Sequence, residues 1–293
     1  MLEKARALEA DVVLLDLEDA VAPAEKNDRT RQQVIDALRA ADWRAPTRGV
    51  RVNGVATQWC YRDLAYVVEH AAASLDVIVV PKVHDASHVH FVDHLLTQLE
   101  LDAGREHGRI ALELLIESGH GVMRVEEIAA ASPRTEALIF GPGDYAASLG
   151  VPQLTVGAIE PDYPGDQWHY VRSRLVAVAR AYGLQAIDGP YAQVRDAAGL
   201  RELARRARLL GMDGKWALHP AQIAALNEIF SPSPEQYARA VAIIAAYRHA
   251  TEVEHRGAVL LDGEMVDEAS RKLALRVEAA GRAAGLSAPA ESP

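Results

Sequence analysis

Seven short apolar segments alternate along this chain with segments of helical period, and that alternation most narrows the possible folds. Continuous apolar runs such as VVLL (12–15) and VIVV (77–80) are typical of strands buried on both faces, as in parallel sheets covered by helices. Repeated strand–helix units of this kind form either an open doubly wound sheet or a closed barrel. The expected strands lie within residues 11–19, 48–53, 77–82, 110–117, 137–144, 184–188 and 214–220.

A polar residue ends each apolar segment at its carboxyl side, and this favours the barrel. In a barrel the carboxyl ends of all strands meet at one mouth, whereas an open sheet spreads them along a crevice. The count is one strand short of eight, and MLEKARALEA (1–10) has the pattern of the helix that would follow a missing first strand. We therefore expect an α/β fold, a TIM (β/α)8-type barrel that apparently lacks its first strand. The polar residues at the strand ends are Glu18, Asp19, Arg51, Asn53, Lys82, Glu117, Asp144, Asp188 and His219.

The pattern changes after His219 to one of helices. Two helices separated at Ser231–Pro234, a hairpin that turns at Gly263 and a terminal helix are expected there. We expect a barrel over residues 1–230, a C-terminal helical extension over residues 231–293 and a frayed tail over residues 286–293.

Composition excludes several classes of function. The formal charge of −10, from 41 acidic and 31 basic side chains, argues against a nucleic-acid partner. Long apolar runs are absent from the sequence and its amino terminus is acidic, so we expect no membrane segment, no signal peptide and a cytoplasmic protein. Cys60 is the only cysteine, which rules out an intrachain disulfide and cysteine-based zinc or iron–sulfur sites.

Glu117 and Asp144 end consecutive expected strands, so a barrel makes them neighbours. Two adjacent carboxylates either share a proton or hold a cation. Hard oxygen ligands favour Mg²⁺ or Mn²⁺, which keeps open positions for water and a chelating substrate. The alternative is that one carboxylate caps a helix or pairs with an arginine.

Two cations and a glycine turn accompany these carboxylates. Arg51 and Lys82 would bind a substrate carboxylate or phosphate, or would instead pair with Glu18 or Asp19. The glycines of GPGDYAASLG (141–150), beginning with Gly141, would let the backbone approach a ligand.

Four histidines lie close together in the sequence: His84, His88, His90 and His94. Their spacing suits a metal cluster, but it is also that of a solvated helix face, which we favour. No GxSxG motif supports a serine hydrolase.

Eight motifs are spread over nearly the whole chain. They are LDLEDAV (15–21), RVNG (51–54), VPK (80–82), LLIESGHGV (114–122), FGPGDYAASLG (140–150), AIDGPY (186–191), GKWALHPAQI (214–223) and DGEMVDEA (262–269). With these motifs in this order, the chain resembles the HpcH/HpaI aldolase and citrate lyase β-subunit superfamily, in particular the CitE-like CoA-ester lyases related to malyl-CoA and citramalyl-CoA lyases.

The resemblance implies a Mg²⁺-dependent TIM barrel with Glu117 and Asp144 as metal ligands. Arg51 would hold the oxygens of a 2-oxo acid, and Glu18 and Asp19 would support that arginine and the metal waters. Substrate would also contact Lys82 and Gly141.

The C-terminal extension has an implied role of its own. The family's GxMxD pattern matches Gly263, Met265 and Asp267, and it forms a lid over a neighbouring subunit in malyl-CoA lyase-like members. Asp267 would then be catalytic, in a homotrimer or homohexamer. Family members usually begin with a strand of RSxLFxPG type, a pattern that this sequence lacks.

The implied activity is reversible aldol/Claisen-type cleavage of a CoA thioester. A malyl-CoA-like, citramalyl-CoA or methylmalyl-CoA substrate would give acetyl- or propionyl-CoA and a 2-oxo acid, either glyoxylate or pyruvate. Two alternatives stay open: a malyl-CoA thioesterase that uses the same residues, and a citryl-ACP lyase-like subunit without independent activity.

Overall fold

The computed structural model divides the chain into two compact units, Met1–Leu226 and Asn227–Pro293. Within them the structure describes residues 5–40 and 42–287. The predicted boundary between residues 230 and 231 stays a prediction.

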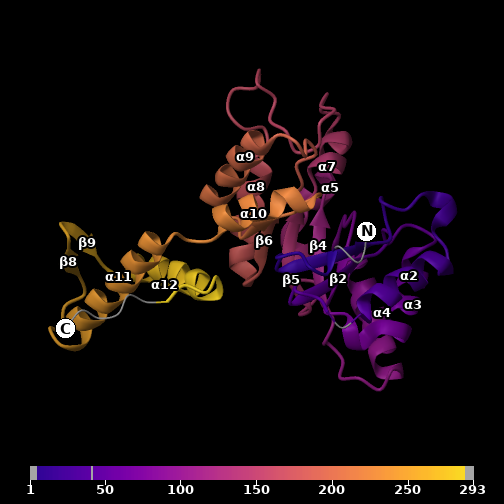
Figure 1. Ribbon diagram of the computed structural model, residues 1–293, viewed down its shortest axis with the longest axis horizontal. Helices are drawn as coiled ribbons and strands as arrows, with labels where there is room; N and C mark the ends of the chain where they lie inside the picture. The colour runs from indigo at the N-terminus through magenta and orange to yellow at the C-terminus, as the bar shows by residue number, and fades with distance from the viewer. Residues whose placement is uncertain (1–4, 41, 288–293) are drawn as a thin grey trace. The chain divides into compact units, whose positions relative to one another are not determined.

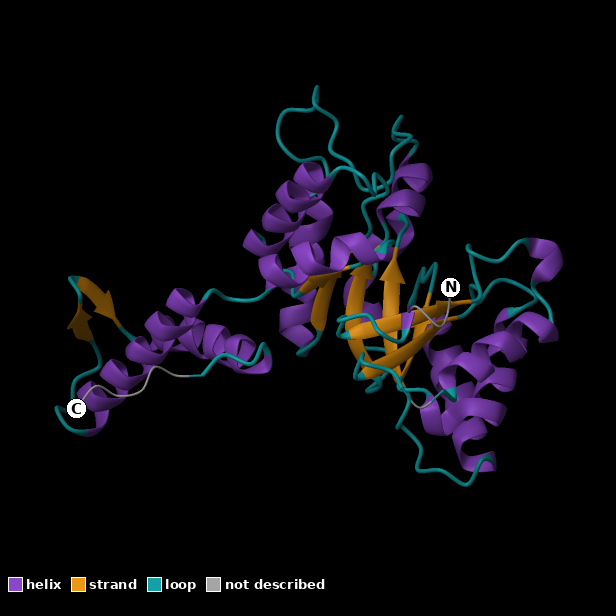
Figure 2. Ribbon diagram, viewed as in Figure 1, coloured by secondary structure: helices purple, strands orange, loops and turns teal. Residues whose placement is uncertain are grey.

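The first unit is built on a parallel sheet of seven strands in the described residues (Figure 1). The strand order follows the chain order, and the strands curl into a half-barrel with β1 and β7 at its edges (Figure 2). This confirms the predicted TIM-like α/β fold. The strands are β1 (Val12–Asp16), β2 (Thr47–Arg51), β3 (Val77–Val80), β4 (Ala111–Ile116), β5 (Thr135–Phe140), β6 (Gln185–Asp188) and β7 (Gly214–Lys215).

The interior of the half-barrel is apolar below the carboxyl ends of the strands. Leu115 pairs with Ile139, and Ile139 pairs with Ile187, so the three side chains lie on one face of the sheet. Leu115 and Ile139 form a buried cluster with Val79, and Trp216 packs against it. Alternate residues of each strand face the surrounding helices instead.

Helices follow the strands and cover the outer face of the sheet (Figure 2). Several βα-loops end in a helix N-cap whose side chain accepts backbone N–H bonds, as Asn27, Asp85, Ser118 and Asp196 do. None of the helices in the described residues is long and apolar enough to cross a membrane. The helices are η1 (Pro23–Glu25), α2 (Asp28–Leu38), α3 (Cys60–Ala71), η2 (Ala72–Ser74), α4 (Ala86–Asp102), α5 (Gly119–Met123), α6 (Val125–Ala129), α7 (Pro142–Leu149), α8 (His169–Tyr182), α9 (Ala197–Leu209) and α10 (Pro220–Phe230).

The helix expected over residues 1–10 lies partly outside the described residues, which begin at residue 5. Residues 5–7 form a helix end and turn, and residues 8–10 are not helical.

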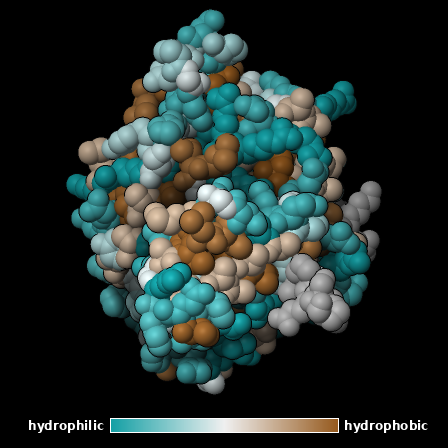
Figure 3. Space-filling model, turned by 90° about the vertical axis from the view of Figure 1, so that its left-hand side faces the viewer, coloured by the Kyte–Doolittle hydropathy of each residue, from teal (hydrophilic) through white to brown (hydrophobic). Residues whose placement is uncertain are grey.

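The second unit contains α11 (Pro234–Glu252), the hairpin strands β8 (Val259–Leu261) and β9 (Glu264–Val266), and α12 (Glu268–Ala283). A capping box of Ser233 and Gln236 begins α11. Gly263, with φ +84°, forms the hairpin turn, so the expected helices and hairpin are confirmed. The cross-strand pair Leu260 and Met265 is exposed. Figure 3 shows one face of the molecule, on which apolar patches lie among polar residues. The predicted tail over residues 286–293 lies mostly outside the described residues.

Candidate active site

Glu18 joins two cations at the carboxyl ends of the strands. It follows β1 and is only 3% exposed. Its Oε1 accepts a 2.5 Å hydrogen bond from Lys82 Nζ, and its Oε2 lies 3.0 Å from Arg51 Nη1 in an ion pair that lacks hydrogen-bond geometry. Burial raises the pKa of Glu18, and the two cations oppose that rise. Of the two alternatives left open by the sequence, the structure therefore shows the pairing of Arg51 and Lys82 with Glu18.

Asp16 fixes the plane of the Arg51 guanidinium. The two residues are paired across β1 and β2, and Arg51 donates from Nε to Oδ1 at 2.8 Å and from Nη2 to Oδ2 at 2.5 Å. Burial disfavours the charged guanidinium, but Asp16 and Glu18 raise the pKa of Arg51 and keep it charged. The Trp216 ring lies 5.6 Å from the guanidinium carbon. The sequence pattern does not mark Asp16 as a site residue; its signal is its place at the carboxyl end of β1, two residues before Glu18.

Glu117 is a buried carboxyl at the end of β4. It is 5% exposed, and its Oε1 accepts a 2.7 Å bond from the Lys82 backbone N–H. Lys82 adopts a left-handed backbone conformation, with φ +53°, which turns that N–H toward the carboxyl. Burial and then the nearby Asp144 raise the pKa of Glu117 to about 8. Gly141 leaves room for it, because a Cβ at that position would lie 2.5 Å from Glu117 Oε2.

Asp144 lies in the first turn of α7 with a partly exposed side chain. The Lys82 ammonium is 3.6 Å from its Oδ2 and 3.5 Å from Asp19 Oδ1. Burial opposes the charge of Lys82, but its bond to Glu18 and the surrounding carboxylates raise the pKa of the ammonium. The structure thus brings Glu18, Asp19, Lys82 and Asp144 together, as predicted.

The donor set at Glu117 and Asp144 fits a hard divalent cation. Glu117 has an abnormally raised carboxyl pKa because it is buried beside a second carboxylate, and a bound cation would relieve that cost. Groups of three or more His, Cys, Asp or Glu side chains able to hold a metal are absent from the described residues. A cation here would depend on two carboxylates and on oxygens from water and substrate, which is the habit of Mg²⁺.

Asp188 and His219 do not contribute to this group of residues as their strand-end positions predicted. Asp188 is fully buried and bonds to Lys215 Nζ at 2.5 Å and to Arg172 Nε at 2.9 Å. Its pKa is lowered, since the two cations outweigh the effect of burial. His219 is exposed and accepts a hydrogen bond from Ala221 N. Asp188 thus belongs to a buried structural ion pair with Lys215 and Arg172.

The four histidines that lie close together in the sequence fall into two pairs in the structure. His90 and His94 are exposed on α4, as a solvated face predicts. The rings of His84 and His88 have centroids 5.5 Å apart, and the centroid of the His120 ring, from α5, lies 6.1 Å from that of His84. Burial and the two neighbouring rings lower the pKa of His84.

Asp267 belongs to the second unit and is the N-cap of α12. Its Oδ1 accepts hydrogen bonds from the backbone N–H and hydroxyl of Ser270, which lower the pKa of the carboxyl. Its predicted catalytic role stays a prediction.

Known proteins resemble the chain in sequence and structure. The model of the HpcH/HpaI aldolase/citrate lyase family matches residues 1–220. The L-malyl-CoA/beta-methylmalyl-CoA lyase of Cereibacter sphaeroides is 41% identical over 283 residues, which cover 94% of this chain and 88% of that protein. A (3S)-malyl-CoA thioesterase of the same species is 37% identical over 266 residues, covering 91% and 85%. The structure of CitE from Mycobacterium tuberculosis in complex with magnesium, acetoacetate and coenzyme A matches with a TM-score of 0.70 and 30% identity, over 93% of this chain and 90% of that one.

Proposed function

This chain belongs to the HpcH/HpaI aldolase/citrate lyase family, and from that premise we propose that it is a Mg²⁺-dependent CoA-ester lyase. It cleaves a carbon–carbon bond in a malyl-CoA-like thioester and releases acetyl-CoA and glyoxylate. The lyase relative acts, by its name, on L-malyl-CoA and beta-methylmalyl-CoA, so propionyl-CoA is a second product to test.

The observation that carries the proposal is the buried Glu117 carboxyl beside Asp144, in one group with Arg51 and Lys82. Glu117 and Asp144 would hold the metal. The bound Mg²⁺ supplies a Lewis acid that lowers the pKa of the substrate hydroxyl and organises the departing 2-oxo acid.

Arg51 binds the oxygens of the 2-oxo acid. Asp16 occupies Nε and one N–H of Nη2, and Nη1 lies 3.0 Å from Glu18 Oε2, so the substrate anion would bind the second N–H of Nη2 and share Nη1 with Glu18. Charge that develops on the oxo-acid oxygen during cleavage is stabilised by this fixed cation, which needs no rearrangement to do so. Lys82 and Glu18 hold the neighbouring charges in place.

Asp267 moves the proton at the thioester α-carbon. In cleavage, the substrate hydroxyl gives its proton to water and becomes the oxo-acid carbonyl, while the electrons of the broken C–C bond pass to the α-carbon, which takes up a proton through Asp267. The Ser270 bonds keep Asp267 ionised, which is the form that removes the α-proton of acetyl-CoA in the condensation direction. A homotrimer or homohexamer in which the second unit covers a neighbouring subunit would deliver it.

The test is a condensation assay with purified protein, acetyl-CoA and either glyoxylate or pyruvate. Malyl-CoA or citramalyl-CoA would be detected by mass, with and without EDTA. A product peak that EDTA abolishes supports the lyase and names the oxo acid. Folded, Mg²⁺-loaded protein that condenses neither acid contradicts the proposal.

A thioesterase is the second candidate function, because the relative at 37% identity is named as one. The two reactions are separated by incubating the protein with malyl-CoA. Free malate and CoA indicate hydrolysis, whereas glyoxylate and acetyl-CoA indicate cleavage.

A further inference from the structure

Lys26 is a partly buried cation beside the candidate active site. It lies in the loop between β1 and α2, and its Nζ donates a 2.5 Å hydrogen bond to Asn53 Oδ1. The ammonium also lies 5.0 Å from the centre of the Trp59 ring. Ion pairs between Lys26 and a carboxylate are absent from the described residues, unlike those of Arg51 and Lys82, which face several.

A buried network builds the acceptor that holds Lys26. Asn53 is 1% exposed, and its backbone N–H and Nδ2 both bond to Asp63 Oδ2, at 3.0 and 2.6 Å. Nδ2 also bonds to Leu17 O at 2.9 Å. Because both partners of Nδ2 are acceptors, the amide orientation is fixed and Oδ1 must face the ammonium.

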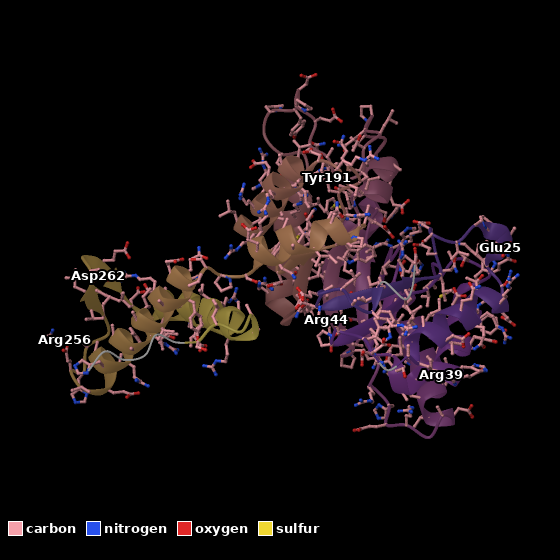
Figure 4. The ribbon with its side chains drawn as sticks, viewed as in Figure 1. Glu25, Arg39, Arg44, Tyr191, Arg256 and Asp262 are labelled. Atoms are coloured by element: carbon pink, nitrogen blue, oxygen red, sulfur yellow. The ribbon has the colours of Figure 1, made fainter. Side chains whose placement is uncertain are left out.

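The carboxylates behind Asn53 are already neutralised. Asp63 receives Arg31 Nε at 2.7 Å, and Asp28 receives Arg31 at 2.8 Å and Arg62 at 2.9 Å. Two carboxylates therefore face two guanidiniums. Glu25, which precedes Lys26 and lies at the surface (Figure 4), is exposed and forms no ion pair with it in the described part of the chain. Among the described residues, the positive charge of Lys26 is therefore left without a carboxylate partner.

Lys26 lies at the edge of the same mouth as the metal-binding carboxylates. The Leu17 carbonyl that Asn53 bonds to immediately precedes Glu18. Gly54, next to Asn53, lies beside Lys82, since a Cβ on Gly54 would be in ordinary van der Waals contact with Lys82 Cβ, at 3.8 Å. Lys26 is therefore held, through Asn53, on the loops that surround this mouth, and the pantetheine arm of CoA would separate a phosphate bound there from the thioester.

We propose that Lys26, held by Asn53 and Trp59, binds a phosphate group of the CoA moiety. This rests on the proposed lyase function, which brings a substrate with several phosphate charges to this mouth. The oxo-acid carboxylate suits the planar fork of Arg51, whereas an ammonium on a flexible stem suits a phosphate as a point charge.

The test compares Lys26→Ala with the wild type on two thioesters. With acetyl-CoA, the loss of one charge-assisted bond should raise KM about tenfold, and KM for glyoxylate and kcat should not change. With acetyl-pantetheine, which lacks the phosphates, the variant and the wild type should be equal. Lys26→Arg should recover part of the loss. An equal rise in KM for both thioesters, or none for acetyl-CoA, would overturn the proposal.

Arg62→Ala is the matched control, because it removes a charge of the same sign from the same group of loops and helices. Arg62 is paired with Asp28, so its loss should leave KM for acetyl-CoA unchanged. A rise in KM for acetyl-CoA equal to that of Lys26→Ala would mean that only the overall positive charge of these loops and helices matters. It would refute a phosphate contact at Lys26.

Calorimetric binding of CoA and of adenosine 3′,5′-bisphosphate gives a readout that does not need turnover. If the wild type shows no lyase activity but Lys26→Ala weakens CoA binding, the lyase proposal fails and the phosphate site stands. If the wild type is active and the variant binds CoA equally well, the phosphate site fails and the lyase stands. Lys26→Gln repeats the measurement if the alanine variant does not fold.

Discussion

Replacement of Gly141 by alanine should disable the metal site through a single methyl group. The new Cβ would lie 2.5 Å from both Cβ and Oε2 of Glu117 and 3.2 Å from its Cδ. Ordinary van der Waals contact needs nearly 1 Å more, so the carboxyl must move by about 1 Å or the α7 N-terminus must retreat. The backbone φ of −102° suits alanine, so the effect is steric and not conformational.

The magnitude follows from that displacement. Overpacking a close-packed site costs about 1–3 kcal/mol of stability, which a folded domain of this size can tolerate. A misplacement of about 1 Å in a group that orients the reaction lowers the rate about 100-fold. We therefore expect Gly141→Ala to lower kcat/KM about 100-fold and to weaken Mg²⁺ binding, with only a modest fall in melting temperature.

The assay combines calorimetric Mg²⁺ titration, thermal unfolding and the condensation reaction. Gly143→Ala is the control, because it adds the same methyl to the same helix turn but meets only the Val156 side chain, at 3.3 Å. The control should keep Mg²⁺ binding and activity. If Gly141→Ala binds Mg²⁺ and turns over like the wild type, then Glu117 does not hold the metal from the position that its carboxyl has in this structure, and the reasoning fails.

Three further predictions concern other charged groups. Asp267→Asn should abolish condensation but retain Mg²⁺ binding, and unchanged turnover would remove Asp267 from the mechanism. Asp188→Asn should lower the free energy of unfolding by about 3–5 kcal/mol, since it leaves Lys215 and Arg172 buried with their shared partner gone; denaturant titration tests this, and a loss of less than about 1 kcal/mol would contradict it. Burial, and then Glu136, raise the pKa of Glu113 to about 7, so the folded state holds a proton that the unfolded state releases near pH 4.5. As the pH rises from about 4.5 to 7, the free energy of unfolding of the wild type should therefore fall relative to that of Glu113→Gln, by at most about 1.4 kcal/mol per pH unit. A difference in unfolding free energy between the two proteins that stays constant over that range would be inconsistent with a buried titrating carboxyl.

The polar residues at the strand ends identified the site, because the carboxyl ends of parallel strands lie at one edge of the sheet. This reasoning identified Glu18, Lys82, Glu117 and Asp144 correctly as neighbours. The same reasoning was wrong for Asp188, because successive side chains of a strand point to opposite faces of the sheet. Ile187 packs into the interior, so Asp188 faces the opposite side, where Arg172 of α8 lies.

The remaining details depend on distances that no local pattern carries. Spacing left open whether Arg51 binds a substrate anion or pairs with acidic neighbours, and the structure shows the second without excluding the first. The contact between Trp216 and Arg51 joins the residue after β7 to β2, and the contact between His84 and His120 joins the loop after β3 to α5. Only the curvature of the sheet and the packing of the loops bring these pairs together.

The charge balance of the mouth explains why a cation belongs there. Asp16, Glu18, Asp19, Glu117 and Asp144 are five carboxyl groups, and Arg51 and Lys82 are the two cations that contact them in the described residues. Such a surface repels both an anionic oxo acid and a polyanionic CoA ester. The raised pKa of Glu117 shows how the protein alone relieves the excess, by keeping one proton on the buried carboxyl. A divalent cation would relieve it more completely and would lower the negative charge that a substrate carboxylate meets near Arg51, so we expect metal binding and substrate binding to be coupled through the same group of charges.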